Sequence, residues 1–215
     1  MPFDPPHYKV RCSSLGSIMP DPRTKGETLS EGAKTYLNGI AKQLAYGYDY
    51  HLDSKYFEKG LIVEEQSIAL YNTVFFTNHQ KNGERRSNDC LTGECDIFTG
   101  SKIIDIKSAW SLHTFPATAA MGADKGYEWQ VRGYMMLWDV DEAEVAYCLV
   151  NTPDELVGYE DPALHYVDHI DEALRVTRLH YTRDKALEEK IEARCRAAQD
   201  YVKDAVWHIE LEHAA

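Results

Sequence analysis

Two segments in the first third of the chain repeat apolar residues at the spacing of an amphipathic helix. After Ser30, which suits a helix N-cap, apolar residues recur every three or four positions to about Tyr46. A second, longer pattern begins at Asp53 or Ser54 and runs to about Thr73. Both segments therefore predict helices with one buried face.

The segments beside these helices are rich in residues that interrupt regular structure. Residues 1–29 contain many Pro, Gly and Ser residues and predict an extended arm or loop, in which 12–20 forms one short helical turn. Residues 78–89 are almost entirely polar and predict a loop.

The middle of the chain changes to patterns typical of strands. Residues 90–98 and 102–109 predict two strands, and the Thr-Gly-Ser sequence at 99–101 predicts a tight turn that joins them as a hairpin. Residues 127–139 predict a helix, and the mostly apolar residues 145–151 predict a central strand that is covered on both faces.

The last third adds one strand and one long helix. Thr152 and Pro153 predict a helix start, with Thr152 as the cap and Pro153 at the first helical position. Residues 175–181 alternate and predict an edge strand, and 184–212 predict one long charged helix. The order of elements predicts an α/β fold, a small mixed β-sheet flanked by helices.

The length and composition indicate a single domain. The chain has 215 residues, of which 44% are hydrophobic and 27% charged, enough for an ample core. We expect one domain over 1–215, with an arm at 1–29, a core at 54–151 and a terminal helix at 184–212.

Several features favour a cytoplasmic protein. No apolar run approaches the roughly 20 residues needed to cross a bilayer, and the N-terminus lacks the pattern of a secretory signal. The five Cys are scattered, which suits a reducing compartment and argues against an iron–sulfur cluster. We therefore expect no membrane partner.

The net charge of −12 argues against a protein that is coated in positive charge for non-specific nucleic-acid binding. It does not exclude a nucleic-acid enzyme that gathers its Lys and Arg in one groove and offsets its carboxylates with metal ions.

The chemistry of the chain is concentrated in the predicted hairpin. Side chains alternate along a strand, so Asp105 and Lys107 share one face, and Asp96 is expected across the hairpin from Asp105. Two buried carboxylates repel each other and lose hydration, a conflict that a divalent cation removes. The pattern predicts a Mg²⁺ or Mn²⁺ site with Asp96, Asp105 and the Ile106 carbonyl as ligands. Lys107 would orient a water or stabilise transition-state charge.

A plain surface hairpin with a Lys–Asp pair is the competing interpretation, because Asp-x-Lys is a common tripeptide. The apolar residues around the charges, as in KIIDIKSAW, are unusual for a solvated face. Glu94 shares a face with Asp96 and is a rival or accessory ligand.

Further motifs flank the hairpin in a suggestive order. A helix Glu precedes it, and a Gln-x-x-x-Tyr motif follows on the next helix, where residues four apart share a face. With these motifs the chain resembles the PD-(D/E)XK nuclease superfamily, and within it the phage-type exonuclease branch of lambda exonuclease, YqaJ-like recombinases and the RecB nuclease domain. The resemblance implies a restriction-endonuclease-like core. The residues that carry it are Glu64, Asp96, Asp105, Lys107, Gln130 and Tyr134.

The resemblance also implies a role for each matching residue. Asp96 and Asp105 would bind metal, and Glu64 would bind a second Mg²⁺ or Mn²⁺ or a metal-bound water. Lys107 would position the attacking water. The neighbouring Glu65 leaves the helix ligand open by one position, although the spacing to the surrounding motif favours Glu64.

Other residues are candidates for substrate binding or support. Gln130 and Tyr134 would hold the hairpin or the nucleic-acid backbone, and Ser108 is placed for a phosphate contact. The N-terminal segment resembles one that touches a terminal phosphate in YqaJ-like proteins, with a simple helix cap as the alternative. Its candidates are Arg11, Ser13 and Ser14. Trp110 is the best candidate for a wall of the cleft.

The function that the resemblance implies is a Mg²⁺-dependent DNA exonuclease that hydrolyses phosphodiester bonds from duplex ends in phage or prophage recombination. Its partners would be double-stranded DNA with a free end, a single-strand-annealing protein and further copies of the chain, in the host cytoplasm. An endonuclease of repair or restriction type and a non-catalytic nucleic-acid-binding module are the alternatives. Strand polarity and the choice between DNA and RNA stay open.

Overall fold

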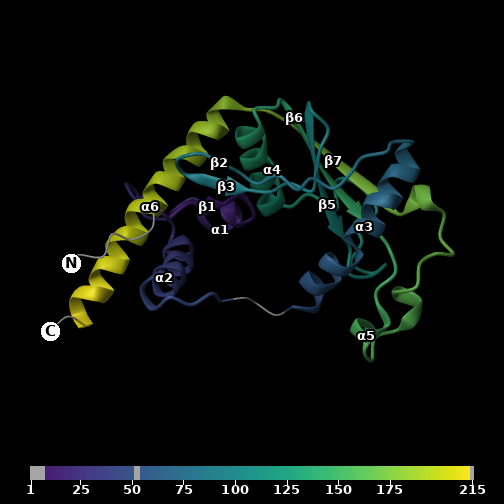
Figure 1. The fold of residues 1–215 in the computed structure, drawn as a ribbon, viewed down its shortest axis with the longest axis horizontal. Coiled ribbons are helices and arrows are strands. Elements are labelled where there is room, and N and C mark those ends of the chain that lie inside the picture. Colours follow the sequence, from purple (N-terminus) through teal and green to yellow (C-terminus); the bar gives the residue numbers. More distant parts are fainter. Residues whose placement is uncertain (1–7, 51–53, 214–215) are drawn as a thin grey trace.

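A mixed four-stranded sheet lies at the centre of the computed structural model, which describes residues 8–50 and 54–213 (Figure 1). The strand order is β4-β5-β6-β7; β5 and β6 run parallel, and the outer pairs are antiparallel. The strands are β4 (Ile97–Phe98), β5 (Lys102–Ser108), β6 (Glu142–Cys148) and β7 (Val176–Thr182). The predicted hairpin turn is confirmed, with Gly100 at a φ of 94°, and β7 is the predicted edge strand.

Helices cover both faces of this sheet, as the α/β prediction required. Helix α3 (Lys55–Phe75) packs on one face and α4 (Lys125–Trp138) on the other. Alternation along β5 divides its side chains between the two faces. Ile104 and Ile106 pack with α3, while Ile103 packs with α4. The predicted two-faced character of this strand is confirmed.

A second, smaller sheet departs from the prediction of one strand over 90–98. That segment divides into β3 (Leu91–Gly93) and β4, and β3 pairs instead with β1 (Val10–Arg11) and β2 (Arg86–Ser87). The break occurs because Asn82, in the loop predicted to be wholly irregular, satisfies the intervening backbone. Its N–H donates to the Asp96 carbonyl at 2.7 Å, and its side-chain amide donates to the Cys95 carbonyl at 3.0 Å.

The N-terminal segment is not the extended arm that its composition predicts. It forms β1, a 3₁₀ turn (Cys12–Ser14) and the short helix α1 (Leu15–Ile18), which confirms the short helical turn predicted within 12–20, and most of its apolar side chains are buried. Close contact with α4 makes this possible. A Cβ at Gly16 would lie 2.8 Å from the Gly126 Cα, and one at Gly133 would lie 2.7 Å from Leu15 Cδ1.

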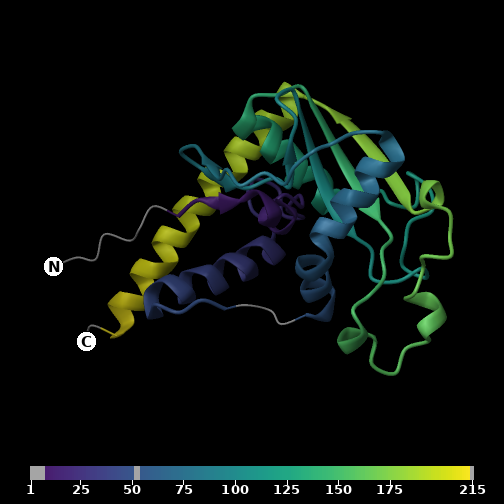
Figure 2. The ribbon, with the colours of Figure 1, turned by 45° about the vertical axis from the view of Figure 1, so that its right-hand side comes forward.

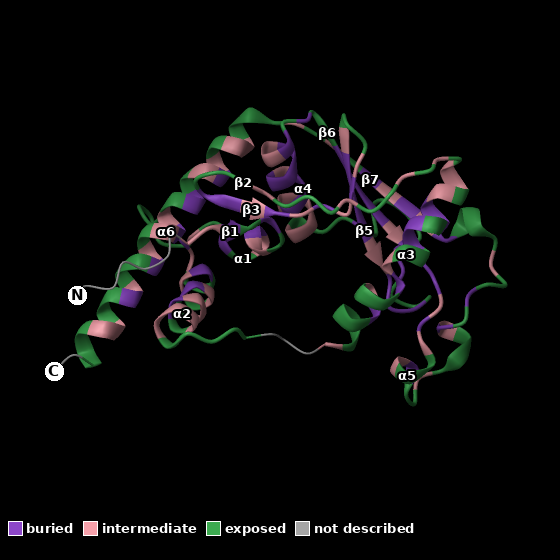
Figure 3. Ribbon diagram, viewed as in Figure 1, coloured by how far each residue is buried: buried purple, intermediate pink, exposed green. Residues whose placement is uncertain are grey.

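Two further helices pack together beyond the small sheet, α2 (Glu31–Tyr46) and α6 (Lys185–His213) (Figures 1 and 2). The predicted cap is confirmed, because Ser30 Oγ accepts a hydrogen bond from the Ala33 N–H at 3.2 Å. Figure 3 shows the buried residues gathered in the sheets and on the inner helix faces, whereas the first turns of α3 are exposed.

The remaining segments are short. Helix α5 spans Asp154–Val157, and 3₁₀ turns span Pro162–Leu164 and Glu172–Leu174. The prediction that Thr152 caps α5 is wrong, because Pro153 takes the N-cap position and the Thr152 hydroxyl is buried in another network. Within the described residues, no helix combines the length and apolar character needed to cross a membrane.

The contact between α1 and α4 gives a stability prediction. Gly16→Ala should lower the free energy of unfolding by about 1–3 kcal/mol, because the new methyl group meets a neighbouring backbone that must move. Gly39→Ala is the matched control, since that helical glycine has no atom within 4 Å of its Cβ position, and the change should be neutral or stabilising. Urea denaturation measures both. Equal effects of the two substitutions would contradict the close contact.

Candidate active site

A cleft of about 710 Å³ opens between α3, the end of β5 and the start of α4. Most residues predicted for the site lie on its walls. They are Glu64, Asp96, Asp105, Ile106, Lys107, Ser108 and Gln130, with Trp110 and Ser13.

Asp105 and Lys107 form the centre of the cleft. The Asp105 side chain is 1% exposed, and its Oδ2 lies 2.8 Å from Lys107 Nζ. Gln130 joins the two, because its Nε2 donates to Asp105 Oδ1 at 3.3 Å and its Oε1 accepts from Lys107 Nζ at 3.3 Å. The same Nε2 also lies 3.0 Å from the hydroxyl oxygen of Tyr134. The Gln-x-x-x-Tyr motif of α4 therefore holds Asp105 and Lys107 of β5 in place.

The Asp96 side chain lies beside the edge of β5, past the end of its pairing with β4. Strand β4 pairs with β5 only at Ile103 and Ile104. Two residues later the Ile106 N–H donates to the Asp96 carboxylate, with 2.6 Å between N and Oδ2. The N–H and C=O of one residue in an extended strand point to the same side, so the Ile106 carbonyl is directed toward Asp96.

The charges of the cleft perturb one another. Burial and the neighbouring Asp105 raise the pKa of Asp96 to about 8. Burial alone would lower the pKa of Lys107, but the carboxylates of Asp105 and Asp96 outweigh it, and the pKa rises above its ordinary value. Lys107 is therefore a cation at neutral pH.

The donor set of the cleft fits a hard divalent cation. Asp105 Oδ2 is buried, and the Lys107 ammonium at 2.8 Å is the cation that lies against it. Asp96 and the Ile106 carbonyl add two more oxygens, the ligand type that Mg²⁺ and Mn²⁺ take. Across residues 8–50 and 54–213, no three acidic, His or Cys side chains are grouped closely enough to hold a metal. Water would supply the other ligands.

Helix α3 presents Glu64 to the cleft and leaves Glu65 exposed outside it. The Glu64 carboxylate is paired with Lys81, whose Nζ lies 2.5 Å from Glu64 Oε2. Sequence analysis did not single out Lys81, because it stands in a polar loop with no periodicity to indicate its direction. Glu94, the rival ligand, is paired with Arg85 at 3.1 Å and is not a lining residue of the cleft.

No protein-family model and no curated protein matches the chain. Among solved structures, a phage-related exonuclease from Haemophilus somnus 129PT is 35% identical, with 94% of this chain and 97% of that chain covered and a TM-score of 0.89. The chain belongs to the phage-related exonucleases. The resemblance to the phage-type branch of the PD-(D/E)XK superfamily is thereby confirmed.

More distant structures share the fold of this exonuclease. An alkaline exonuclease from Laribacter hongkongensis is 15% identical, with a TM-score of 0.70 and coverage of 96% of this chain and 93% of that chain. The structure of the same enzyme in complex with dAMP is 17% identical, with a TM-score of 0.69 and the same coverage.

The candidate phosphate-contacting residues of the exonuclease are only partly gathered in the cleft. Ser108 lines it, and its Oγ lies 2.8 Å from Ser67 Oγ on α3. At the N-terminus Ser13 is a lining residue, whereas Arg11 and Ser14 are not among those that the structure places on the cleft wall.

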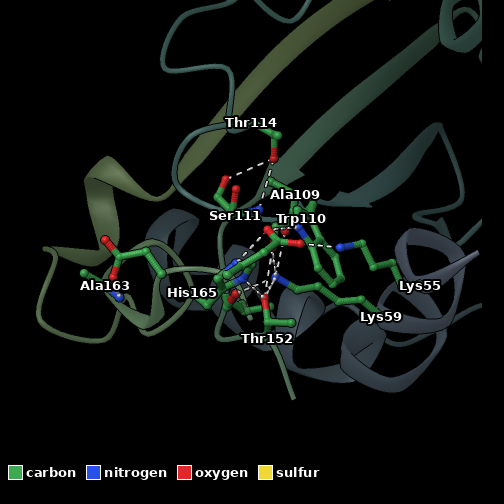
Figure 4. A network of polar contacts seen from close by, with 12 residues as sticks. Lys55, Lys59, Ala109, Trp110, Ser111, Thr114, Thr152, Ala163 and His165 are labelled. Atoms are coloured by element: carbon green, nitrogen blue, oxygen red, sulfur yellow. Dashed lines mark hydrogen bonds and ion pairs between the residues drawn. The ribbon is translucent and has the colours of Figure 1, made fainter. Parts of the chain in front are cut away.

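A buried ammonium supports the part of the wall that carries Trp110 (Figure 4). Lys59 on α3 is fully buried, and its Nζ bonds to the carbonyls of Ala109 (2.7 Å), Trp110 (3.0 Å) and Val150 (2.9 Å) and to the Thr152 hydroxyl (2.9 Å). These acceptors lie in the segments that follow β5 and β6. Lys59 therefore ties both strand ends to α3. This role could not be predicted from the sequence, since a lysine in an amphipathic helix ordinarily faces water.

The indole of Trp110 is fixed by a second set of contacts in the same network. Its Nε1 donates to Glu160 Oε2 at 3.0 Å, and the same carboxylate lies 3.1 Å from His165 Nε2 and pairs with Lys55 (Figure 4). Tyr56 packs edge-on against the indole, with 5.1 Å between ring centroids. The predicted position of Trp110 at the cleft is confirmed, although the side chain is 7% exposed.

The raised pKa of Asp96 predicts how stability depends on pH without metal. An acid whose pKa rises from 3.8 to about 8 on folding stabilises the protein most below pH 3.8, and this contribution is lost as the pH rises through 8. With chelator present, the Tm of the wild type should fall by about 5 °C relative to Asp96→Asn between pH 6 and pH 8. The Asn side chain retains an acceptor for the Ile106 N–H. Parallel pH profiles of the two proteins would contradict the raised pKa.

Replacement of Lys59 tests the network around it. Lys59→Met should lower the free energy of unfolding by about 2–4 kcal/mol, because three buried carbonyls and the Thr152 hydroxyl lose their donor. Lys55→Met, in the same helix but at an exposed ion pair, should change it by less than about 1 kcal/mol. Urea denaturation distinguishes them, and a Lys59→Met protein as stable as the wild type would rule out this role.

Proposed function

We propose that the protein is a Mg²⁺- or Mn²⁺-dependent deoxyribonuclease that hydrolyses phosphodiester bonds from the ends of double-stranded DNA. One observation supports the metal dependence: two carboxylates, those of Asp96 and Asp105, meet in a cleft beside the Ile106 backbone, with the Lys107 ammonium as their neighbouring cation. The membership of the phage-related exonucleases supports action at DNA ends.

Asp96, Asp105 and the Ile106 carbonyl are the residues that would hold the first ion, with Glu64 available to a second. Bound there, a divalent cation supplies an activated water and neutralises charge on the phosphate. The protein's own contribution is orientation. Lys107 holds a positive charge beside the attacking oxygen and the developing phosphorane charge, and Gln130 fixes both Lys107 and Asp105 from α4. The Ser108 hydroxyl can donate to a phosphate oxygen.

We further propose that several copies of the chain act together, in recombination with a single-strand-annealing partner. The net charge of −12 supports cooperation between copies, since a single acidic chain provides little attraction for DNA outside its cleft. The partner protein rests on the family resemblance alone. Size-exclusion chromatography with light scattering measures the assembly, and a purely monomeric protein would contradict it.

Digestion of end-labelled linear duplex DNA tests the main proposal. The wild type with Mg²⁺ or Mn²⁺ should degrade the duplex, and chelator should abolish this. Lys107→Ala and Asp105→Ala should each lower kcat by roughly 10²–10³-fold or more, because they remove the cation beside the reacting phosphate and a metal ligand.

Two controls make the digestion decisive. A covalently closed circular duplex should stay intact, and its cleavage would favour the endonuclease alternative. Lys125→Ala is the matched substitution, since that lysine is 84% exposed and is not a lining residue of the cleft. Wild-type rates in Lys107→Ala and Asp105→Ala would overturn the mechanism.

A further inference from the structure

Glu64, like Asp105, has a cation of the chain against its carboxylate, and this cation comes from a loop outside β5. Lys81 Nζ lies 2.5 Å from Glu64 Oε2, and the two side chains are 50% and 17% exposed, respectively. Asp105 faces Lys107 and Asp96 accepts the Ile106 N–H, so each carboxylate of the cleft has a different donor.

The loop that carries Lys81 is anchored before the lysine. The side chain of Asn72, near the end of α3, donates to the His79 carbonyl at 3.0 Å. Its Oδ1 accepts from the His79 N–H at 2.9 Å and from the Thr77 hydroxyl at 2.8 Å. These bonds fix the loop two residues ahead of Lys81.

The same loop is anchored directly after the lysine, on the segment that carries a proposed metal ligand. Asn82 donates from its backbone to the Asp96 carbonyl at 2.7 Å and from its side chain to the Cys95 carbonyl at 3.0 Å. The backbone on both sides of Lys81 is therefore fixed, and from this position the Lys81 ammonium reaches the Glu64 carboxylate.

The electrostatics show that this ammonium serves more than one carboxylate. The hydrogen bond to Glu64 raises the pKa of Lys81, and the charges of Glu64, Asp96 and Glu94 add to it. Lys81 is thus fully charged at neutral pH. It lies against the carboxylate with which Glu64 would meet a divalent cation, and two cations cannot share one carboxylate at short distance without repulsion.

We propose that Lys81 competes with a divalent cation for Glu64, so that Glu64 joins the metal site only when its ion pair with Lys81 is broken. This inference rests on the proposed function. It implies that the DNA-free protein binds one ion at Asp96 and Asp105 well and a second ion poorly. A phosphate of bound DNA offers Lys81 another acceptor, which would free Glu64 when substrate is present.

Calorimetric titration of the DNA-free full chain with MnCl₂ tests the competition without measuring activity. Lys81→Met should tighten the weaker binding event by roughly tenfold relative to the wild type, and Lys81→Gln should behave alike. The double variant Lys81→Met with Glu64→Gln should lose this gain. Arg85→Met is the matched control, because Arg85 lies in the same loop and pairs with Glu94, which does not line the cleft.

The outcomes separate this inference from the proposed function. If the wild type binds Mn²⁺ and both Lys81 variants give the same isotherm, the competition is overturned while the metal site stands. An equal gain in Arg85→Met also overturns it, because a general loss of positive charge would then explain the effect. If neither the wild type nor the Lys81 variants bind Mn²⁺, the metal site and the competition fail together.

Discussion

Two acidic side chains, the half-buried Asp96 and the buried Asp105, lie together on the wall of the cleft, where β4 ends beside β5. Burial and the charge of Asp105 raise the pKa of Asp96. Such a pair is stable only if neighbouring groups offset its charge. The Ile106 N–H, the Lys107 ammonium and the Gln130 amide do so, and the proposed metal ion would complete this compensation.

The need to offset these two negative charges explains which elements of the fold position the site. The full-length parallel pairing of β5 with β6 gives Asp105 and Lys107 a rigid base, while β4 pairs with β5 over only two residues. Because β4 is short, the Asp96 side chain, not a backbone carbonyl, reaches the Ile106 N–H. The helices then act from both faces, with Gln130 on α4 and Glu64 on α3.

The same arrangement bears on how an acidic exonuclease would meet DNA. The cations of the cleft are engaged with acids, Lys107 with Asp105 and Lys81 with Glu64. Attraction for phosphate in this region therefore depends on ions that the carboxylates recruit or on ammonium groups that they release. Trp110 lies on the wall of this cleft, in a segment whose backbone is bonded to Lys59 and whose indole is bonded to Glu160. This part of the wall is therefore fixed, whereas the ion pairs of the cleft could exchange partners.

Much of the candidate active site could be predicted from local sequence patterns. Alternation along β5 predicted that Asp105 and Lys107 share a face, and the four-residue spacing of Gln130 and Tyr134 predicted a common helix face. Ser30 predicted the start of a helix. Each of these predictions depends only on the geometry of one element. Contacts between distant segments were decided by packing. The burial of the N-terminal segment against α4, the break between β3 and β4 imposed by Asn82, and the positions of Lys59 and Lys81 each require a partner many residues away, and no local pattern encodes that partner.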